Sequence, residues 1–191
     1  MLSPLRFFVL FLLALASMSA APAFPATAAG VTELKTLPAG LLVRSETQGD
    51  YFQKSGELFR PLFRYIQRKD IAMTTPVESH PGATSAMLFW VGVAEQPKAR
   101  GDLLPSAPAA PEGVVVLERP ARLVASHGGR GGYSRERFEQ AREVVLAWIA
   151  SRSDLQVAGE AYGVYWNSPF VPPFLKRYEV HVPVSPTPAR P

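Results

Sequence analysis

The sequence predicts an α+β domain made of two ββαββ repeats, whose eight strands form a distorted antiparallel barrel with two helices packed against it. Three observations carry this prediction. Two segments have helical periodicity, the other apolar segments are short and extended, and the order of these elements occurs twice along the chain. Because a half of about 70 residues cannot bury a core by itself, we expect both repeats to share one domain.

The first thirty residues have the pattern of a secretory signal peptide. One cation, Arg6, precedes an apolar run from Phe7 to Ala16, and small residues follow. No charged residue lies between Arg6 and Glu33, so an uncleaved membrane anchor is the alternative, although the run is short for a membrane span. We therefore expect a periplasmic or secreted protein that keeps no membrane contact after cleavage.

Two A-x-A sites bracket the expected cleavage. Cleavage follows Ala23 at the first and Ala28 at the second, so residues 1–28 are assigned to the signal and 29–191 to a single domain. The chain has no cysteine, which excludes thiolate ligation of a metal or of haem and also a lipoprotein anchor. The net charge of +4 comes from scattered basic residues, a pattern that does not indicate a nucleic-acid partner.

The first repeat, residues 32–95, contains a helical segment from Ser55 to Lys69. Its apolar side chains fall within about 140° of arc at about 100° per residue. They are Leu58, Phe59, Leu62, Phe63 and Ile66. Pro61 is tolerated near a helix start, which makes Ser55 a plausible N-cap.

The second helical segment runs from about Ser134 to Ser151, in the second repeat, residues 114–184. One face is apolar and the other is charged. The apolar residues are Phe138, Ala141, Val144, Val145, Trp148 and Ile149. Ser134 is the expected N-cap, and Glu136 in the first turn suits the helix dipole.

The remaining apolar segments are expected strands. In order they are Thr32–Leu37, Leu41–Glu46, Ile71–Glu78, Ala86–Val93, Val114–Glu118, Arg122–Ser126, Glu160–Trp166 and Tyr178–Val184. The linker 96–113 is rich in Pro, Ala and Gly and has no periodicity, so we expect a surface connection there. Pro76 donates no backbone hydrogen bond and holds Thr75 extended, which places this segment at a sheet edge or a bend.

The three histidines give weak evidence for a metal site. His181 alternates with valines in YEVHVPV and is expected to face solvent. His80 lies before a Pro-Gly turn, and His127 precedes a glycine-rich stretch that we interpret as a mobile loop rather than a phosphate cradle. His80 and His127 remain the candidate ligands, and no nucleophile elbow, paired carboxylates or H-E-x-x-H motif supports an enzyme.

A stripe of arginines lies opposite the apolar face of the first helical segment. Arg60, Arg64 and Arg68 are spaced by four, and like charges at that spacing destabilise a helix by about 0.2 to 0.5 kcal/mol per pair. The stripe is either simply solvated or holds an anionic ligand at the rim of an apolar surface.

Several motifs resemble the SOUL haem-binding family. FRPLFRYI followed by IAMTTPV, within residues 58–77, is similar to the family's helix and its Met-Thr-Ala-Pro-Val segment. PARLVA at 120–125 and the run from YWNSPF to FLKRYEV at 165–180 extend the resemblance to nearly all of residues 32–184. Thr75 departs from the usual alanine and Tyr178 from the usual asparagine.

The resemblance implies the fold predicted above, shared with gyrase-inhibitor-like effector-binding domains. It also implies non-covalent haem binding on an apolar surface near the first helix, with basic residues at the propionates, one of which maps to Arg64. No axial histidine is nominated by it.

We therefore expect a periplasmic binder of haem or a related tetrapyrrole, and not an enzyme. The candidate binding residues are Arg60, Arg64, Arg68, Tyr65, Met73 and Lys176. The alternative is an interaction or sensor module that binds a protein or another amphipathic small molecule, and a tetrapyrrole-processing or hydrolytic enzyme is a third hypothesis without a residue constellation.

Overall fold

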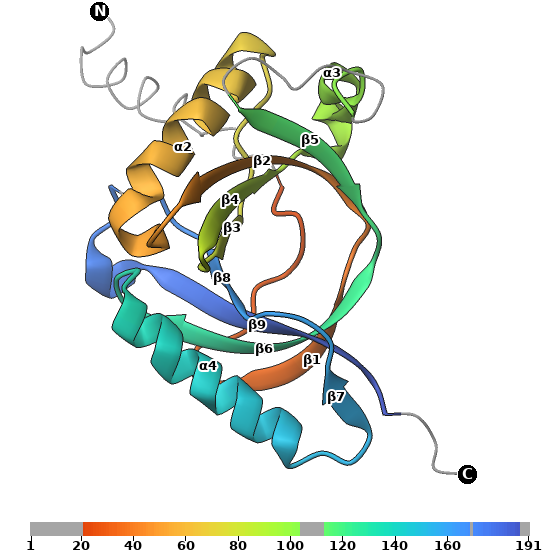
Figure 1. Ribbon diagram of the computed structural model, residues 1–191, viewed down its shortest axis with the longest axis vertical. Coiled ribbons are helices and arrows are strands. Elements are labelled where there is room, and N and C mark those ends of the chain that lie inside the picture. Colours follow the sequence, from red (N-terminus) through yellow and green to blue (C-terminus); the bar gives the residue numbers. More distant parts are fainter. Residues whose placement is uncertain (1–20, 104–112, 169, 188–191) are drawn as a thin grey trace, which may run out of the picture.

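The computed structural model describes residues 21–103, 113–168 and 170–187, so most of the expected signal segment lies outside the described residues. The predicted α+β class is confirmed: a curved antiparallel sheet surrounds an interior, and helices cover its outer faces (Figure 1). No described helix is long and apolar enough to cross a membrane.

The described elements follow the predicted repeat with a few additions. The strands are β1 (Thr32–Leu37), β2 (Gly40–Gln48), β3 (Val77–His80), β4 (Thr84–Trp90), β5 (Val114–Arg119), β6 (Arg122–Arg130), β7 (Leu155–Val157), β8 (Tyr162–Tyr165) and β9 (Arg177–Pro186). The helices are α2 (Tyr51–Arg68), α3 (Gln96–Arg100) and α4 (Arg135–Ala150), with 3-10 turns η1 (Val93–Glu95) and η2 (Pro173–Leu175). The short strand β7, the turn η1 just before the expected linker and the helix α3 inside it were not predicted.

The strands pair in the order β1-β6-β9-β8-β3-β4-β2-β5, and β7 pairs with β9 off this path. Every one of these ladders is antiparallel. The order interleaves the two repeats, because β6, β8 and β9 of the second lie between β1 and β3 of the first. The repeats therefore form one body, as predicted, while a ladder closing the barrel between β1 and β5 is not among the described pairings.

Helix α2 begins earlier than predicted. Asp50, not Ser55, is the N-cap, and its side chain accepts a hydrogen bond of 3.0 Å from the Phe52 amide. The additional turn brings Tyr51 and Phe52 into contact with the core, which the later start had left out. Pro61 consequently lies inside the helix rather than near its start. Helix α4 begins at the predicted N-cap, Ser134, whose hydroxyl accepts from the Arg137 amide.

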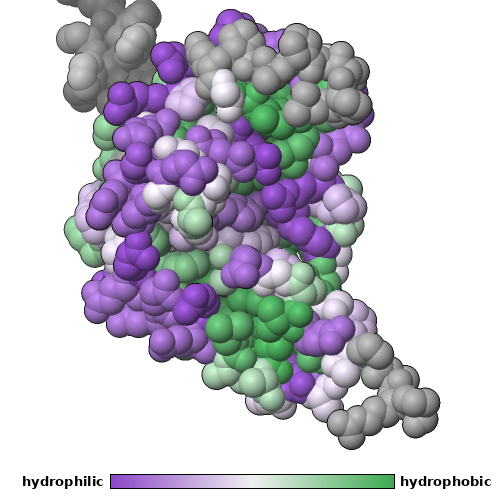
Figure 2. Space-filling model, viewed as in Figure 1, coloured by the Kyte–Doolittle hydropathy of each residue, from purple (hydrophilic) through white to green (hydrophobic). Residues whose placement is uncertain are grey.

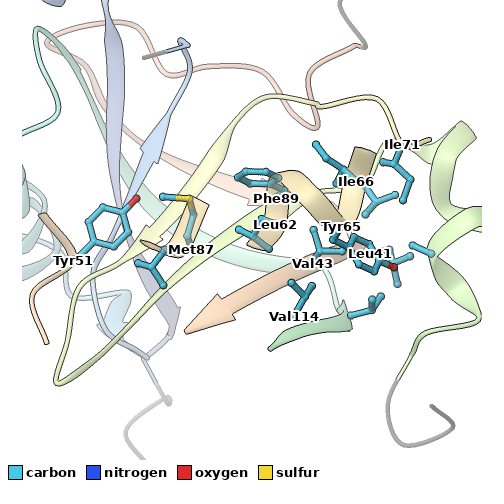
Figure 3. Close-up of a cluster of buried hydrophobic side chains, with 14 residues drawn as sticks. Leu41, Val43, Tyr51, Leu62, Tyr65, Ile66, Ile71, Met87, Phe89 and Val114 are labelled. Carbon is cyan, nitrogen blue, oxygen red and sulfur yellow. The ribbon is translucent and has the colours of Figure 1, made fainter. Parts of the chain in front are cut away.

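The outer faces of the sheet are covered by the two long helices. Figure 3 shows the cluster under α2, in which Tyr51 and Met87 lie together at one end and Tyr65, Ile66 and Ile71 at the other. Helix α4 packs on β6 and β9 through Phe138, Ala141, Val145 and Ile149. The surface seen in Figure 2 is mostly hydrophilic and is interrupted by smaller hydrophobic areas.

The interior of the ring is a third buried layer, and it overturns the prediction for His181. Val180 and Val182 pack under α4, so His181 and Glu179 point the other way, into the interior, where both are fully buried. Alternation correctly separated the two faces of β9. It could not show that the second face is also closed, because that closure comes from strands far away in the sequence.

The glycine-rich stretch after His127 is also different from the prediction. It belongs to β6 and pairs with β9 from Gly128↔Glu179 to Arg130↔Arg177 instead of forming a mobile loop. The segment before β3 is a bend, with a cis peptide bond between Thr75 and Pro76, and β3 begins at Val77 rather than at Ile71.

Candidate functional site

A pocket of about 470 Å³ lies between the first half of α2, the bend that precedes β3, and the chain around β8. Its walls come from both repeats. The lining residues are Tyr51, Phe52, Ser55, Gly56, Phe59, Met73, Thr74, Thr75, Val77, Met87, Tyr133, Tyr165, Asn167, Ser168 and Lys176. The segment that identified the family by resemblance therefore forms one wall of this pocket.

The pocket is apolar and aromatic, with a single charge at its wall. Lys176 is the only charged residue among the described lining residues. Its ammonium lies 5.0 Å from the centre of the Tyr133 ring, a cation–π distance. An apolar cavity that carries one cation favours a flat or bulky apolar ligand with a negatively charged group.

Tyr133 and Tyr165 form an aromatic pair in the wall of the pocket. Their rings stack with centroids 4.0 Å apart and an interplanar angle of 10°. The Tyr133 hydroxyl accepts from the Asn167 amide at 2.9 Å and donates to the Arg177 carbonyl at 3.1 Å. Burial raises the pKa of Tyr165 to about 12, so its phenol is neutral at physiological pH.

Gly56 opens the pocket toward the backbone of α2. A Cβ atom placed on it would meet no heavy atom within 4 Å. A glycine inside a helix costs about 1 kcal/mol relative to alanine, so this position weakens α2 and leaves space at the pocket wall.

The arginine stripe lies beside the pocket rather than in it. Arg60, Arg64 and Arg68 are exposed and do not line the cavity. At 3.6 residues per turn, Arg60 lies only about 40° around the helix from Gly56, Arg64 about 80° and Arg68 about 120°. Arg60 is therefore the arginine best placed to reach a group that emerges from the pocket.

The other two predicted contacts on this side have different positions. Tyr65 is in the core with 0% exposure, and its hydroxyl donates to Asp102 at 2.9 Å. Its side chain therefore faces away from the pocket. Met73 has 40% exposure and lines the pocket.

None of the three histidines lines the pocket. The imidazole of His80 stacks on Tyr162 with centroids 4.6 Å apart and hydrogen-bonds Glu78 at 3.1 Å. His127 is 2.8 Å from the Thr32 hydroxyl. Within the described residues, no three His, Cys, Asp or Glu side chains form a group able to hold a metal ion.

The residues present fit an apolar macrocycle better than a histidine-ligated iron. The potential iron donors in the described walls are the sulfur atoms of Met73 and Met87, the phenols of Tyr51, Tyr133 and Tyr165, and the Lys176 amine. Binding would therefore depend mainly on burial of the ring faces.

Sequence reasoning missed Gly56 and Tyr133 as pocket residues. The signal for Gly56 was present, because a glycine within an amphipathic helix needs a reason. Tyr133 lies between the glycines after β6 and the N-cap of α4, and only folding brings it against β8.

A separate polar network fills the interior of the ring around two buried carboxylates. Glu78 accepts from Trp90 Nε1 at 3.0 Å and is paired with Arg122 and His80. Burial opposes its ionisation, but the hydrogen bond from His80 and the charge of Arg122 prevail and lower the pKa of Glu78 to about 2.

The second carboxylate, Glu179, has even more donors. Five reach it: the Thr27 amide, Trp166 Nε1, the Ser126 hydroxyl, Lys35 Nζ and His181 Nε2. Burial opposes ionisation here as well, but the hydrogen bond from His181 and the charge of Lys35 lower the pKa of Glu179 to about 2. Burial also lowers the pKa of His181, so this imidazole is neutral at pH 7.

Comparison with solved structures supports the fold. The C-terminal domain of EcmrR has 12% identity and a TM-score of 0.62, covering 81% of this chain and 97% of that domain. A hydrolase from Listeria innocua has 13% identity and a TM-score of 0.54, with 83% and 94% covered. SAV2435 bound to tetraphenylphosphonium has 13% identity and a TM-score of 0.50, with 81% and 94% covered.

The family is shown by the sequence itself. No curated protein matches the chain. The family described as SOUL heme-binding protein matches residues 21–183, which include both repeats and every described wall of the pocket. The chain therefore belongs to the SOUL heme-binding protein family.

Proposed function

We propose that this protein binds haem or a related tetrapyrrole non-covalently in the pocket between α2 and β8, in the periplasm or outside the cell. The observation that carries the proposal is the apolar, aromatic cavity of about 470 Å³ in a member of a heme-binding family. Its volume is in the range of small-molecule and cofactor sites. The leader-like pattern of the first thirty residues supports export.

Affinity would come mainly from apolar burial. Removing ring surface from water is worth about 25 cal/mol per Å², and the stacked pair Tyr133 and Tyr165 supplies aromatic contact area in the wall. Met73 and Met87 add adaptable sulfur contacts along another wall.

Orientation would come from cations around the pocket. Lys176 is in the wall, and Arg60 and Arg64 follow on the exposed side of α2. The two propionates lie on one edge of the haem macrocycle, so cations on either side of the pocket opening can each pair with one of them. We propose Lys176 and Arg60 as the main partners of the two propionates, with Arg64 next and Arg68 too far around the helix.

A binding role rather than an enzymatic one is supported by the chemistry of the walls. The lining hydroxyls of Ser55, Thr75 and Ser168 have no carboxylate or imidazole beside them among the described lining residues. A carboxylate or imidazole is the most common base that activates a hydroxyl nucleophile, and the one other candidate base among the described lining residues is the Lys176 amine.

A titration of hemin into the purified protein, followed by the Soret band, tests the proposal. We expect saturable one-to-one binding that is lost in Gly56→Leu, because the new side chain enters the cavity. Leucine is also a far better helix former than glycine, so this variant should be more stable by about 1 kcal/mol, and unfolding cannot explain lost binding. Gln53→Leu, on an exposed part of α2, is the matched control and should bind normally.

Two further sets of variants test the orientation and the iron ligand. Lys176→Ala and Arg60→Ala should each weaken binding, with Arg60→Ala more harmful than Arg68→Ala. His80→Ala and His127→Ala should leave the Soret spectrum unchanged, since neither lines the pocket. Absence of saturable binding, or equal binding by Gly56→Leu, would contradict the proposed site.

A non-haem role for the same pocket is the second candidate. SAV2435 is bound to tetraphenylphosphonium, an apolar cation, and shares the fold. The described lining of the present pocket has no acidic residue and one lysine, which disfavours a cation. Competition between hemin and tetraphenylphosphonium decides between them: displacement of hemin by the cation would favour the sensor role.

A further inference from the structure

The segment before β1 crosses the middle of the ring of strands instead of lying on the surface (Figure 1). Phe24 has 5% exposure, and its ring contacts Trp90 and Trp166, each at 5.5 Å between centroids and nearly perpendicular. The ammonium of Lys35 lies 5.7 Å from its centre. Phe24 is thus part of the interior core, together with Leu37, Leu42, Leu88, Val124, Tyr162 and Val164.

Polar contacts fix the same segment to the interior network. The Thr27 amide donates to Glu179 Oε1 at 2.8 Å, and the Thr27 hydroxyl donates to Glu33 at 2.7 Å. Lys35 Nζ donates to the Pro25 carbonyl at 3.0 Å. The two residues on either side of Pro25 and Ala26 are therefore anchored, Phe24 by aromatic packing and Thr27 by hydrogen bonds.

Strand β6 has a glycine, Gly128, at the point where residues 24–28 pass over it. A Cβ on Gly128 would lie 2.4 Å from the Ala28 carbonyl oxygen and 2.7 Å from that of Thr27, so only glycine allows this approach. The Gly30 amide donates to the Gly128 carbonyl at 2.8 Å, and the Gly128 amide donates to the Val31 carbonyl at 3.1 Å. Part of the glycine-rich stretch of β6 thereby accommodates the segment.

We infer that residues 24–28 are a permanent plug of the ring, and that signal cleavage therefore occurs after Ala23 and not after Ala28. This inference depends on the export component of the proposed function. Cleavage after Ala28 would remove Phe24, which packs between two tryptophans. It would also remove the Thr27 amide, one of the hydrogen-bond donors to Glu179. Cleavage after Ala23 keeps both. It removes the exposed Ala21 and Pro22 and the half-buried Ala23, whose amide donates to the Thr75 carbonyl at 2.9 Å, which is a smaller loss than an aromatic core residue and a donor to a buried carboxylate.

Expression of the full chain with its own leader in a Gram-negative host tests the cleavage. The intact mass of the periplasmic protein should correspond to a chain that begins at Phe24. Ala28→Asp, at an exposed position, should leave the chain beginning at Phe24, with the mass changed only by the substitution itself, whereas Ala23→Asp should abolish this cleavage, because a carboxylate replaces the small residue before the bond. A chain beginning at Ala29 overturns the inference, and an unprocessed chain overturns both the cleavage site and the export proposal.

A second measurement tests the plug itself and does not depend on export. Phe24→Ala in the full chain should reduce the folding equilibrium constant about 100-fold or more, measured by urea unfolding. Phe170→Ala is the matched control, since Phe170 is 94% exposed, and it should change little. Equal effects of the two substitutions would refute the plug. Hemin affinity should be unchanged in Phe24→Ala, because this side chain does not line the pocket, so failure of the plug and failure of the haem proposal are distinguishable.

Discussion

Replacing Glu78 with glutamine should destabilise the protein at neutral pH and much less in acid. The folded protein holds this carboxylate ionised through Trp90, His80 and Arg122, whereas the unfolded chain leaves it in water. Its pKa is about 2 in the folded state against 4.5 for a free carboxyl group. The stabilisation is therefore complete above pH 4.5 and is lost as the pH falls from 4.5 toward 2.

The magnitude follows from that difference in pKa. One pH unit of difference corresponds to 1.36 kcal/mol, so lowering the pKa from 4.5 to about 2 gives about 3 kcal/mol at pH 7. Glutamine keeps the shape and can still accept from Trp90, but it leaves Arg122 without its ionic partner in the interior. We expect Glu78→Gln to cost about 3 kcal/mol at pH 7, and this cost should fall to about 1 kcal/mol at pH 2.5.

Urea unfolding of both proteins between pH 7 and pH 2.5 gives this difference directly. Glu143→Gln, an exposed change on α4, controls for the loss of one negative charge and should be neutral at every pH. A difference between Glu78→Gln and the parent protein that stays constant with pH would refute the reasoning, because a purely steric effect does not titrate.

Three further substitutions test the packing. Leu62→Ala, on the fully buried face of α2, should cost about 2 to 5 kcal/mol in urea unfolding, whereas Phe63→Ala at the exposed neighbouring position should cost much less. Ser134→Ala should cost about 1 kcal/mol through loss of the α4 N-cap, measured in the same way. Gly129→Ala should lower the melting temperature, because its Cβ would lie 2.3 Å from the Tyr178 ring, and overpacking of this kind costs about 1 to 3 kcal/mol; an unchanged melting temperature would show that Tyr178 moves aside freely.

Hydrophobic periodicity and capping residues were sufficient to predict the two long helices of the fold. Of the five apolar residues whose periodicity predicted the buried face of α2, Leu58, Leu62 and Ile66 are buried, whereas Phe59 lines the pocket and Phe63 is exposed. Ser134 marked the start of α4. The start of α2 was predicted wrongly because Asp50, earlier in the chain, takes the capping position expected for Ser55 and accepts from the Phe52 amide.

The candidate site was only partly accessible from sequence. Met73 and Lys176 were found through their motifs, but Tyr133 and Gly56 were not, and Tyr65 was placed near the ligand although it is in the core. A helical pattern gives the angle between side chains around one axis. It does not give which sector of that helix faces a cavity formed by the other repeat.

The sequence alone determined the class of the fold, its twofold repeat and the family, because these depend on short-range periodicity and on contiguous motifs. The tertiary structure alone decided what lies inside the ring. Glu179 and His181 alternate with buried valines and are indistinguishable in sequence from a solvent-facing row, yet they meet Trp166, Lys35 and Thr27 from distant segments. Burial of a second sheet face is a property of closure over long sequence separations, and no local pattern records it.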